Sequence, residues 1–193
     1  MDFIQIADDI LNHKILFLPN KNKTYRIYEI EMYYCNDQHK DLYTHCHPLQ
    51  LENGSFYLHR LPNKVSFKEG TYKCMDYTLG DKNTNTYFGV LIRAMIDVQT
   101  GEFYAGPCIC VNQLFSHYQE NDSSMTSKLF SEKYNINEEF KLLPCTLNIL
   151  PLLHGPRIGL NNEKYPEFRN KNYRFVTYTK YIKEKNTVNP ITS

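Results

Sequence analysis

The pattern of apolar and polar positions predicts the elements of the first half of the chain. Between Phe3 and Leu11, apolar residues recur at helical spacing, which predicts an amphipathic helix over residues 2–12. Residues 36–53 are polar and rich in Asn, Asp and His, so we expect a long ordered loop there. Segments rich in β-favouring residues and bounded by Gly, Asn or Pro predict strands at 25–34, 55–60, 71–78 and 87–97.

The second half of the chain contains helix signals followed by strand signals. Gly106-Pro107 opens a predicted helix, because proline fits the first helical turn and apolar residues continue after it. Asp122 or Ser123 can cap a further helix that runs to Tyr134. Late strands are predicted at 146–150 and 173–180. No repeat, low-complexity segment or linker divides the chain, so we predict one α+β domain over residues 1–193, with a mixed, largely antiparallel, curved sheet and packed helices.

Composition narrows the class of protein. Apolar residues make up 41% of the 193 residues, with 16 Tyr and 11 Phe, which indicates a globular chain and excludes intrinsic disorder. No apolar run approaches the roughly 18 residues of a membrane span. The acidic start Met1-Asp2 is unlike a signal peptide, so the six cysteines are expected to be reduced thiols. We therefore expect a soluble monomer of the nucleus or cytoplasm, without a membrane partner.

The charge of the chain limits how it can contact nucleic acid. A net charge of +1 lacks the basic excess that is typical of proteins holding a long duplex, so any basic surface must be local. One basic cluster is interrupted by a single acid, Glu69, and consists of His59, Arg60, Lys64, Lys68 and Lys73. A second lies in the tail from Glu163 onward, where solvated lysines on an ordinary surface are the alternative interpretation.

The most informative chemistry lies on the predicted strand 25–34. A strand period of two puts five residues on one face: Tyr25, Ile27, Glu29, Glu31 and Tyr33. Two neighbouring carboxylates between large side chains either face solvent or line a polar cleft, because burial without partners is unfavourable. The segment Thr44-His45-Cys46-His47 follows closely and could bring imidazole to these acids.

Other patterns of reactive residues point less clearly to a site. The residues Cys35, His39, His45, Cys46 and His47 are of the types that bind zinc, but adjacent ligands do not reach one tetrahedral ion easily. We therefore predict no metal and no cofactor. Cys108-Ile-Cys110 is one residue too short for a thioredoxin-type pair. Arg157 could contact a phosphate or form a salt bridge.

An ordered series of segments resembles the alkyladenine (3-methyladenine) DNA glycosylase family. Arg26-Ile-Tyr-Glu-Ile-Glu-Met-Tyr33 is similar to the family's R-I-V-E-T-E-A-Y strand, and Thr44-His45-Cys46 to its A-H-S. The further matches, in chain order, are Gly54–His59, Cys74–Tyr77, Val90–Met95, Gly106–Cys110, Arg157–Leu160 and Tyr173–Val176. The resemblance spans residues 25–178 and implies a glycosylase-like fold.

The resemblance implies roles for particular residues. Glu31 falls on the family's general base, and Arg93 on the arginine that helps to orient the attacking water. Tyr33 and His45 fall on aromatic residues that line the pocket for a flipped-out base. Asp76 stands where the family has a pocket asparagine, so an acceptor replaces a group that also donates.

The chain also departs from the family at the predicted duplex contact. His59 stands where the family has a third pocket tyrosine, and Pro62 where it has the tyrosine that wedges into the duplex. Leu61 is the nearby apolar residue that could act as a wedge, and residues 63–70 form an insertion. Residues expected to contact nucleic acid are Arg60, Leu61, Lys64, Lys68, Lys73 and Arg157.

Three hypotheses for function follow. The first is a hydrolase of base-excision DNA repair, an N-glycosylase that removes a damaged or modified purine with a water activated by Glu31, from DNA or alternatively from RNA. The second is a non-catalytic domain that binds nucleic acid or nucleotides on the same scaffold. An open pocket beside Glu31 would favour the first, and a closed salt bridge to Arg93 the second. The third is a metal-assisted hydrolase that uses His45 and its neighbours.

Overall fold

A computed structural model describes the chain except for residues 61–71, 120–135, 161–164, 181, 183–186 and 192–193. Within the described part, the protein is a mixed α+β structure with one ten-stranded sheet. Every strand pair recorded in it is antiparallel. The strands are β1 (Lys14–Leu18), β2 (Lys23–Cys35), β3 (Asn53–Leu58), β4 (Met75–Leu79), β5 (Tyr87–Asp97), β6 (Phe103–Ala105), β7 (Lys141–Pro144), β8 (Leu153–Gly155), β9 (Arg174–Val176) and β10 (Asn189–Pro190).

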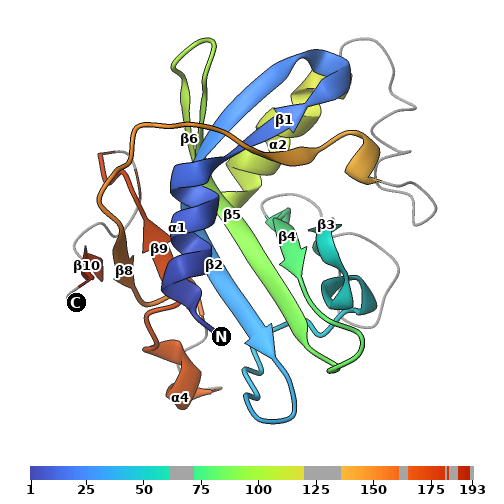
Figure 1. Ribbon diagram of the computed structural model, residues 1–193, viewed down its shortest axis with the longest axis vertical. Helices are drawn as coiled ribbons and strands as arrows, with labels where there is room; N and C mark the ends of the chain where they lie inside the picture. The colour runs from blue at the N-terminus through green and yellow to red at the C-terminus, as the bar shows by residue number, and fades with distance from the viewer. Residues whose placement is uncertain (61–71, 120–135, 161–164, 181, 183–186, 192–193) are drawn as a thin grey trace.

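The long strands β2 and β5 form the middle of the sheet (Figure 1). The main path through the sheet is β10-β8-β9-β2-β5-β4-β3, while β1 joins β2 to β7 and β6 pairs with β5. The helices described are α1 (Phe3–His13), α2 (Pro107–Gln119) and the short α4 (Pro166–Arg169). Three 3-10 turns complete the elements: η1 (Pro19–Lys21), η2 (Pro48–Leu51) and η4 (Ile136–Glu138). No helix in the described ranges is long and apolar enough to cross a membrane.

Most of the predicted elements are present with bounds close to those expected. The predicted helix at 2–12 is α1, whose first turn is capped by the Asp2 carboxylate, and the predicted strand at 87–97 is β5 itself. The strand predicted at 146–150 is wrong, because this segment is irregular and lies between β7 and β8. Strands β1, β6, β7 and β8 were not predicted, since each is only three to five residues long. The helix predicted from Asp122 or Ser123 to Tyr134 lies outside the described residues.

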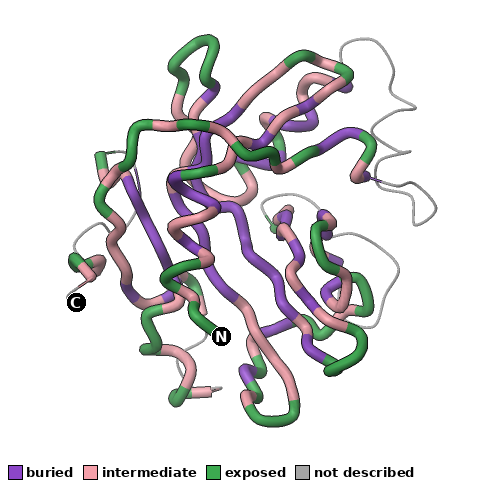
Figure 2. Tube along the Cα trace, viewed as in Figure 1, coloured by how far each residue is buried: buried purple, intermediate pink, exposed green. Residues whose placement is uncertain are grey.

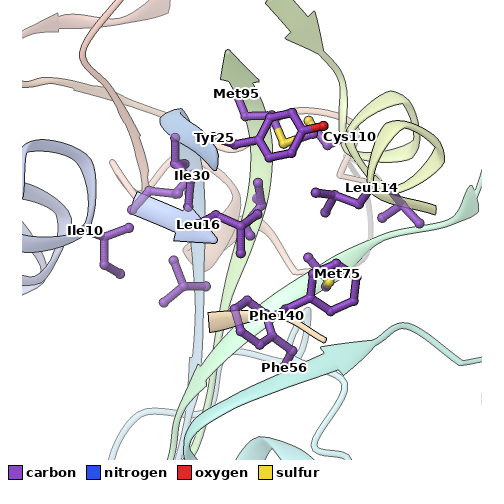
Figure 3. Packing of buried hydrophobic residues seen from close by; sticks show 14 of the residues in the cluster. Ile10, Leu16, Tyr25, Ile30, Phe56, Met75, Met95, Cys110, Leu114 and Phe140 are labelled. Carbon is purple, nitrogen blue, oxygen red and sulfur yellow. The ribbon is translucent and has the colours of Figure 1, made fainter. Parts of the chain in front are cut away.

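The hydrophobic core lies between the sheet and the two longer helices. Ile10 of α1 and Leu114 of α2 join Ile30 of β2 and Met95 of β5 in one buried cluster (Figure 3). Buried residues make up most of β2 and β5 (Figure 2). This cluster holds one face of the central strands against the helices, so the other face remains for the polar side chains described below.

A β-bulge in β2 overturns the prediction that Tyr25, Ile27, Glu29, Glu31 and Tyr33 share one face. The pairing register with β5 shifts on both sides of Glu29, and Arg93 of β5 lies at the same irregularity. As a result, Ile27 and Ile30 both belong to the core, although three residues separate them. An extra residue in one strand reverses the inward and outward positions beyond it. The bulge therefore sends Tyr25 and Ile27 into the core and Glu31 and Tyr33 to the opposite face.

Candidate functional site

A pocket of about 280 Å³ lies on the face of the sheet where Glu31 and Tyr33 emerge. Five of the residues predicted for a base-binding site line it together: Tyr33, His45, His59, Asp76 and Arg93. They come from β2, the loop before η2, the residue that follows β3, β4 and β5. The remainder of the wall is formed by Tyr43, Gln50, Cys74, Leu91, Pro107 and the segment Ile158–Leu160. The pocket is thus small, largely aromatic and apolar, and contains a few charged groups, as is typical of a small-molecule site.

Glu31 lies directly behind the wall of this pocket. Its side chain is 0% exposed and accepts three interactions from groups that line the pocket. Oε1 accepts a hydrogen bond from the Ile158 backbone N–H at 2.7 Å, and Oε2 accepts one from the Tyr33 hydroxyl at 2.9 Å. Oε2 also lies 3.2 Å from Nη1 of Arg93. Burial raises the pKa of Glu31, and the opposing effects of Arg93, Ile158 and Tyr33 do not cancel this rise.

The Tyr33 hydroxyl is held in its protonated form beside Glu31. Burial and the negative charge of Glu31 raise the pKa of Tyr33 well above its ordinary value. The hydroxyl therefore donates to the carboxylate over the whole physiological range of pH. The Arg157 guanidinium stacks over the Tyr33 ring, with Cζ 4.5 Å from the ring centroid. Both contacts fix the orientation of this aromatic wall.

Glu29, Arg93 and Arg174 extend the charged network behind the pocket. Nε of Arg93 lies 3.2 Å from Oε1 of Glu29, and Nε of Arg174 lies 2.7 Å from the same oxygen. Arg174 is fully buried on β9, and its Nη1 donates to the Thr187 hydroxyl at 3.2 Å. Cations and carboxylates thus alternate along Arg174, Glu29, Arg93 and Glu31. This alternation compensates the desolvation of four charged groups in the protein interior.

His59 and Asp76 form a second ion pair on the pocket wall. Nε2 of His59 donates to Oδ1 of Asp76 at 2.6 Å, while Nε2 of Gln50 donates to Oδ2 at 3.1 Å. Burial alone would lower the pKa of His59, but the charge of Asp76 and the hydrogen bond to it raise the pKa to about 9. His59 is therefore an imidazolium at neutral pH. Gly89 leaves room for this arrangement, because a Cβ there would lie 2.3 Å from Oδ2 of Asp76.

His45 lies at the exposed edge of the pocket. Its ring meets the His59 ring edge-to-face at 4.4 Å between centroids, and its Nδ1 lies 3.3 Å from the Tyr57 hydroxyl. The next residue, Cys46, has a φ of +49°, a left-handed conformation that turns the chain sharply there. The turn allows a loop residue to complete a pocket whose other walls are strands.

Comparison with known proteins gives one informative similarity. No family model matches the chain. The chain is 37% identical, over 201 aligned positions, to "Uncharacterized protein L759" of Acanthamoeba polyphaga mimivirus, and the match covers 96% of this chain and 90% of that protein. The chain belongs to the family of this mimivirus protein. The name of this relative states no activity, so the chemistry of the site is the guide to function.

The sequence left open whether Arg157 contacts a phosphate or forms a salt bridge. In this member of the mimivirus family, Arg157 forms a salt bridge. Its Nη1 and Nη2 lie 2.6 Å and 3.2 Å from the two carboxylate oxygens of Asp41. Nη1 also donates to the Met32 carbonyl at 3.0 Å, and the side chain has no exposed surface. A guanidinium buried in this way does not reach a phosphate at the surface, which corrects its assignment as a nucleic-acid contact.

The other residues predicted to contact nucleic acid are either held by protein contacts or lie outside the described residues. Arg60 is 9% exposed and thus belongs to the interior rather than to an open basic surface. Nζ of Lys73 donates to Oδ1 of Asn112 on α2 at 2.9 Å. Leu61, Lys64 and Lys68 lie outside the described residues. The described part of the chain thus provides little of the predicted basic cluster.

Several residues of the site were not predicted from the sequence. Gln50 holds the lining residue Asp76, while Asp41 and Arg174 hold Arg157 and Glu29 behind the wall, yet none of the three belongs to a motif that signals this role. Only the positions of their partners, which are 26 to 145 residues away, reveal them. Within the described ranges, no group of three or more His, Cys, Asp and Glu side chains is placed to hold a metal ion.

Proposed function

We propose that this protein is an N-glycosylase that hydrolyses the base–sugar bond of a modified purine in nucleic acid, with DNA as the first candidate substrate and RNA as the alternative. The main support for the proposal is the position of Glu31, a buried carboxylate of raised pKa that lies behind an aromatic pocket. The ordered resemblance to alkyladenine DNA glycosylases, with residues of seven of its segments meeting at this pocket, supports a fold of that kind. An enzyme of base excision would act in the nucleus or cytoplasm.

The pocket suits a single nucleobase. Its volume of about 280 Å³ lies just below the roughly 300–1,000 Å³ typical of sites for drug-sized ligands. Tyr33, Tyr43, His45 and His59 provide ring faces and edges for stacking. Leu91 and Ile158 complete an apolar wall that excludes bulk water.

In the proposed reaction, Glu31 takes a proton from water as the water oxygen bonds to the anomeric carbon. The bond from that carbon to the base nitrogen breaks, and its electron pair leaves with the base. Water reaches Glu31 by entering between its carboxylate and Nη1 of Arg93, which are 3.2 Å apart. Arg93 remains anchored to Glu29 through Nε during this opening. The raised pKa of Glu31 makes it a stronger base than an exposed glutamate.

A second candidate function is a binding domain that recognises a nucleotide without cleaving it. The complete burial of Glu31 and its ion pair with Arg93 favour this alternative, because a carboxylate in a closed pair can serve only to shape the pocket. The two functions share the same ligand site. They differ in whether the base is released.

The experiment that tests the first function measures released bases and abasic sites. The full chain is incubated with single- and double-stranded DNA and RNA that carry alkylated or deaminated purines. Bases are detected by chromatography and abasic sites by alkaline cleavage. Release of a base supports the glycosylase, whereas tight binding without release supports the binding domain.

Glu31→Gln tests the assigned base directly. We expect a decrease of about 10²- to 10⁴-fold in the rate of base release, the range of general-base assistance. Glu52→Gln is the matched control, because Glu52 carries the same charge but lies on the surface in a pair with Lys82. Rates are compared per folded molecule, as judged by circular dichroism. Wild-type release by Glu31→Gln would remove Glu31 from the mechanism.

A further inference from the structure

The two ion pairs of the pocket are oriented in the same way. The Arg93 side chain is 9% exposed and its partner Glu31 is 0% exposed, while the His59 side chain is 10% exposed and its partner Asp76 is 1% exposed. In each pair the cation is the more exposed member: Arg93 lines the pocket with Glu31 behind it, and His59 lines the pocket beside a nearly covered Asp76. A ligand in the pocket therefore contacts more of the two cations than of either carboxylate.

The Asp76 pair is built into the fold rather than formed by chance side-chain rotation. The Gln50 side chain is oriented by the His47 backbone N–H, which donates to Oε1 at 3.2 Å, so Nε2 must point at an acceptor. Oδ2 of Asp76 is that acceptor, and its other oxygen is then directed at His59. Gly89 keeps the space open beneath both side chains. The His59 ring is thus held with its Nε2–H directed at the Asp76 carboxylate, whose negative charge favours the protonated ring.

We infer that the pocket selects an oxopurine, a base that is uncharged or anionic and carries a carbonyl on its edge, and discriminates against cationic alkylated purines. The inference rests on the proposed function in taking a nucleobase as the occupant. It goes beyond that function by assigning the substrate class to His59 and Asp76, the positions at which the chain departs from the glycosylases it resembles.

The chemistry of the leaving base agrees with a cationic wall. A cationic purine departs as a neutral molecule and needs no positive group, and two cations in the wall repel it. A neutral oxopurine departs with negative charge spread over its ring and carbonyl. Positive groups fixed in advance stabilise that charge more in the transition state than in the ground state.

The described groups that surround His59 are consistent with a lasting positive charge. Asp76 on β4 pairs with it, the Cys74 side chain hydrogen-bonds to it, and both raise the pKa of His59. The rings of Tyr57 on β3 and His45 in the loop pack against it at 5.4 Å and 4.4 Å between centroids.

The test compares ligands that differ in charge but hardly in shape. Short single-stranded DNAs carry 1-methylinosine, 1-methyladenine or xanthine at one position, each on a 2′-fluoro sugar that resists hydrolysis. The first base is neutral, the second is a cation of nearly the same outline, and the third is largely an anion at neutral pH. Fluorescence anisotropy at pH 7 gives the affinities. We expect the neutral and anionic bases to bind at least about tenfold more tightly than the cation. Repulsion between the cationic base and one buried positive group is enough for a difference of this size.

Asp76→Asn is the informative variant. The asparagine can turn its carbonyl to Gln50 and its amide to a neutral His59, so both hydrogen bonds survive while the imidazolium charge is lost. We expect the discrimination against 1-methyladenine to fall to within about threefold, with an unchanged circular dichroism spectrum and a cooperative unfolding transition at pH 7 as the check on the fold. His154→Gln, a histidine outside this pocket, should leave all three affinities unchanged.

The outcomes separate this inference from the proposed function. Equal or tighter binding of the cation by the wild type overturns the inference alone, as does full discrimination by Asp76→Asn. Failure of all three DNAs, and of their double-stranded and RNA counterparts, to bind above the unmodified sequence overturns the nucleobase as occupant and with it the proposed function.

Discussion

The two faces of β2 show how differently apolar and charged side chains are held in the same protein. On one face, Ile30 and Met32 pack against the helices in the main core. On the other, Glu29 and Glu31 are just as inaccessible to water but are surrounded by Arg93, Arg174 and hydrogen-bond donors. Both faces are buried, yet only the second one requires particular partners.

The difference follows from the physics of burial. An apolar side chain is stabilised by leaving water, whatever apolar neighbour it finds. A carboxylate loses several kcal/mol of hydration, and only well-placed cations and donors restore it. The apolar face of β2 should therefore tolerate substitutions of similar volume, whereas the charged face should depend on each member of its network.

The largest effect is expected when the charged face loses one partner. Arg174→Met leaves Glu29 buried with Arg93 as its remaining ion-pair partner, and we expect a loss of about 3–5 kcal/mol in the free energy of unfolding. Urea denaturation measures it. Lys82→Met is the control, because its pair with Glu52 is exposed and should contribute less than about 1 kcal/mol. Equal losses in the two variants would contradict the view that the buried network is held by its partners.

A smaller effect is expected on the apolar face. Ile30→Ala removes three carbons from a fully buried site and should lower the free energy of unfolding by about 2–5 kcal/mol. Ile30→Val, which keeps most of the volume, should lower it by only about 0.5–1.5 kcal/mol. Urea denaturation again distinguishes them. A loss for Ile30→Val as large as that for Ile30→Ala would show that this face also demands a particular side chain.

The smallest effect is a pH dependence of the second ion pair. The pKa of His59 rises from an ordinary 6.5 to about 9 in the folded protein, so the stabilisation from its charge is complete below pH 6.5. Between these values the unfolded chain loses the proton first, and up to about 3 kcal/mol is lost as the pH rises through 9. The difference in stability between wild type and Asp76→Asn, measured by urea denaturation from pH 6 to 10 under reducing conditions, should fall over this window. A constant difference would show that His59 is neutral in the folded protein.

The elements of the fold could be predicted where their sequence pattern is long. Helix α1 has enough periodic positions, and strand β5 a long enough run of β-favouring residues, to be recognised with nearly correct bounds. Strand β8 is too short for any period to appear and exists because β9 and β10 pair with it. The bulge in β2 could not be predicted either, since nothing in the local order of Tyr28 and Glu29 differs from a regular strand.

The candidate site could likewise be predicted only where short sequence motifs indicate it. Tyr33, His45, His59, Asp76 and Arg93 were expected together from the ordered resemblance, and they do line one pocket. The resemblance could not indicate that Asp76 would carry a charged His59, because that depends on Gln50 and Gly89. Arg157 had two open interpretations, and the position of Asp41 decides between them.

Local sequence patterns were enough to indicate the longer helix and strand segments and the residue types available for chemistry. This was possible because periodicity and composition are local properties, which a few neighbouring residues express. Only the tertiary structure decided which face of β2 Glu31 occupies, which cation pairs with each carboxylate, and which member of each pair faces the pocket. These outcomes depend on burial and on groups distant in the chain, and charged groups respond to both far more strongly than apolar ones.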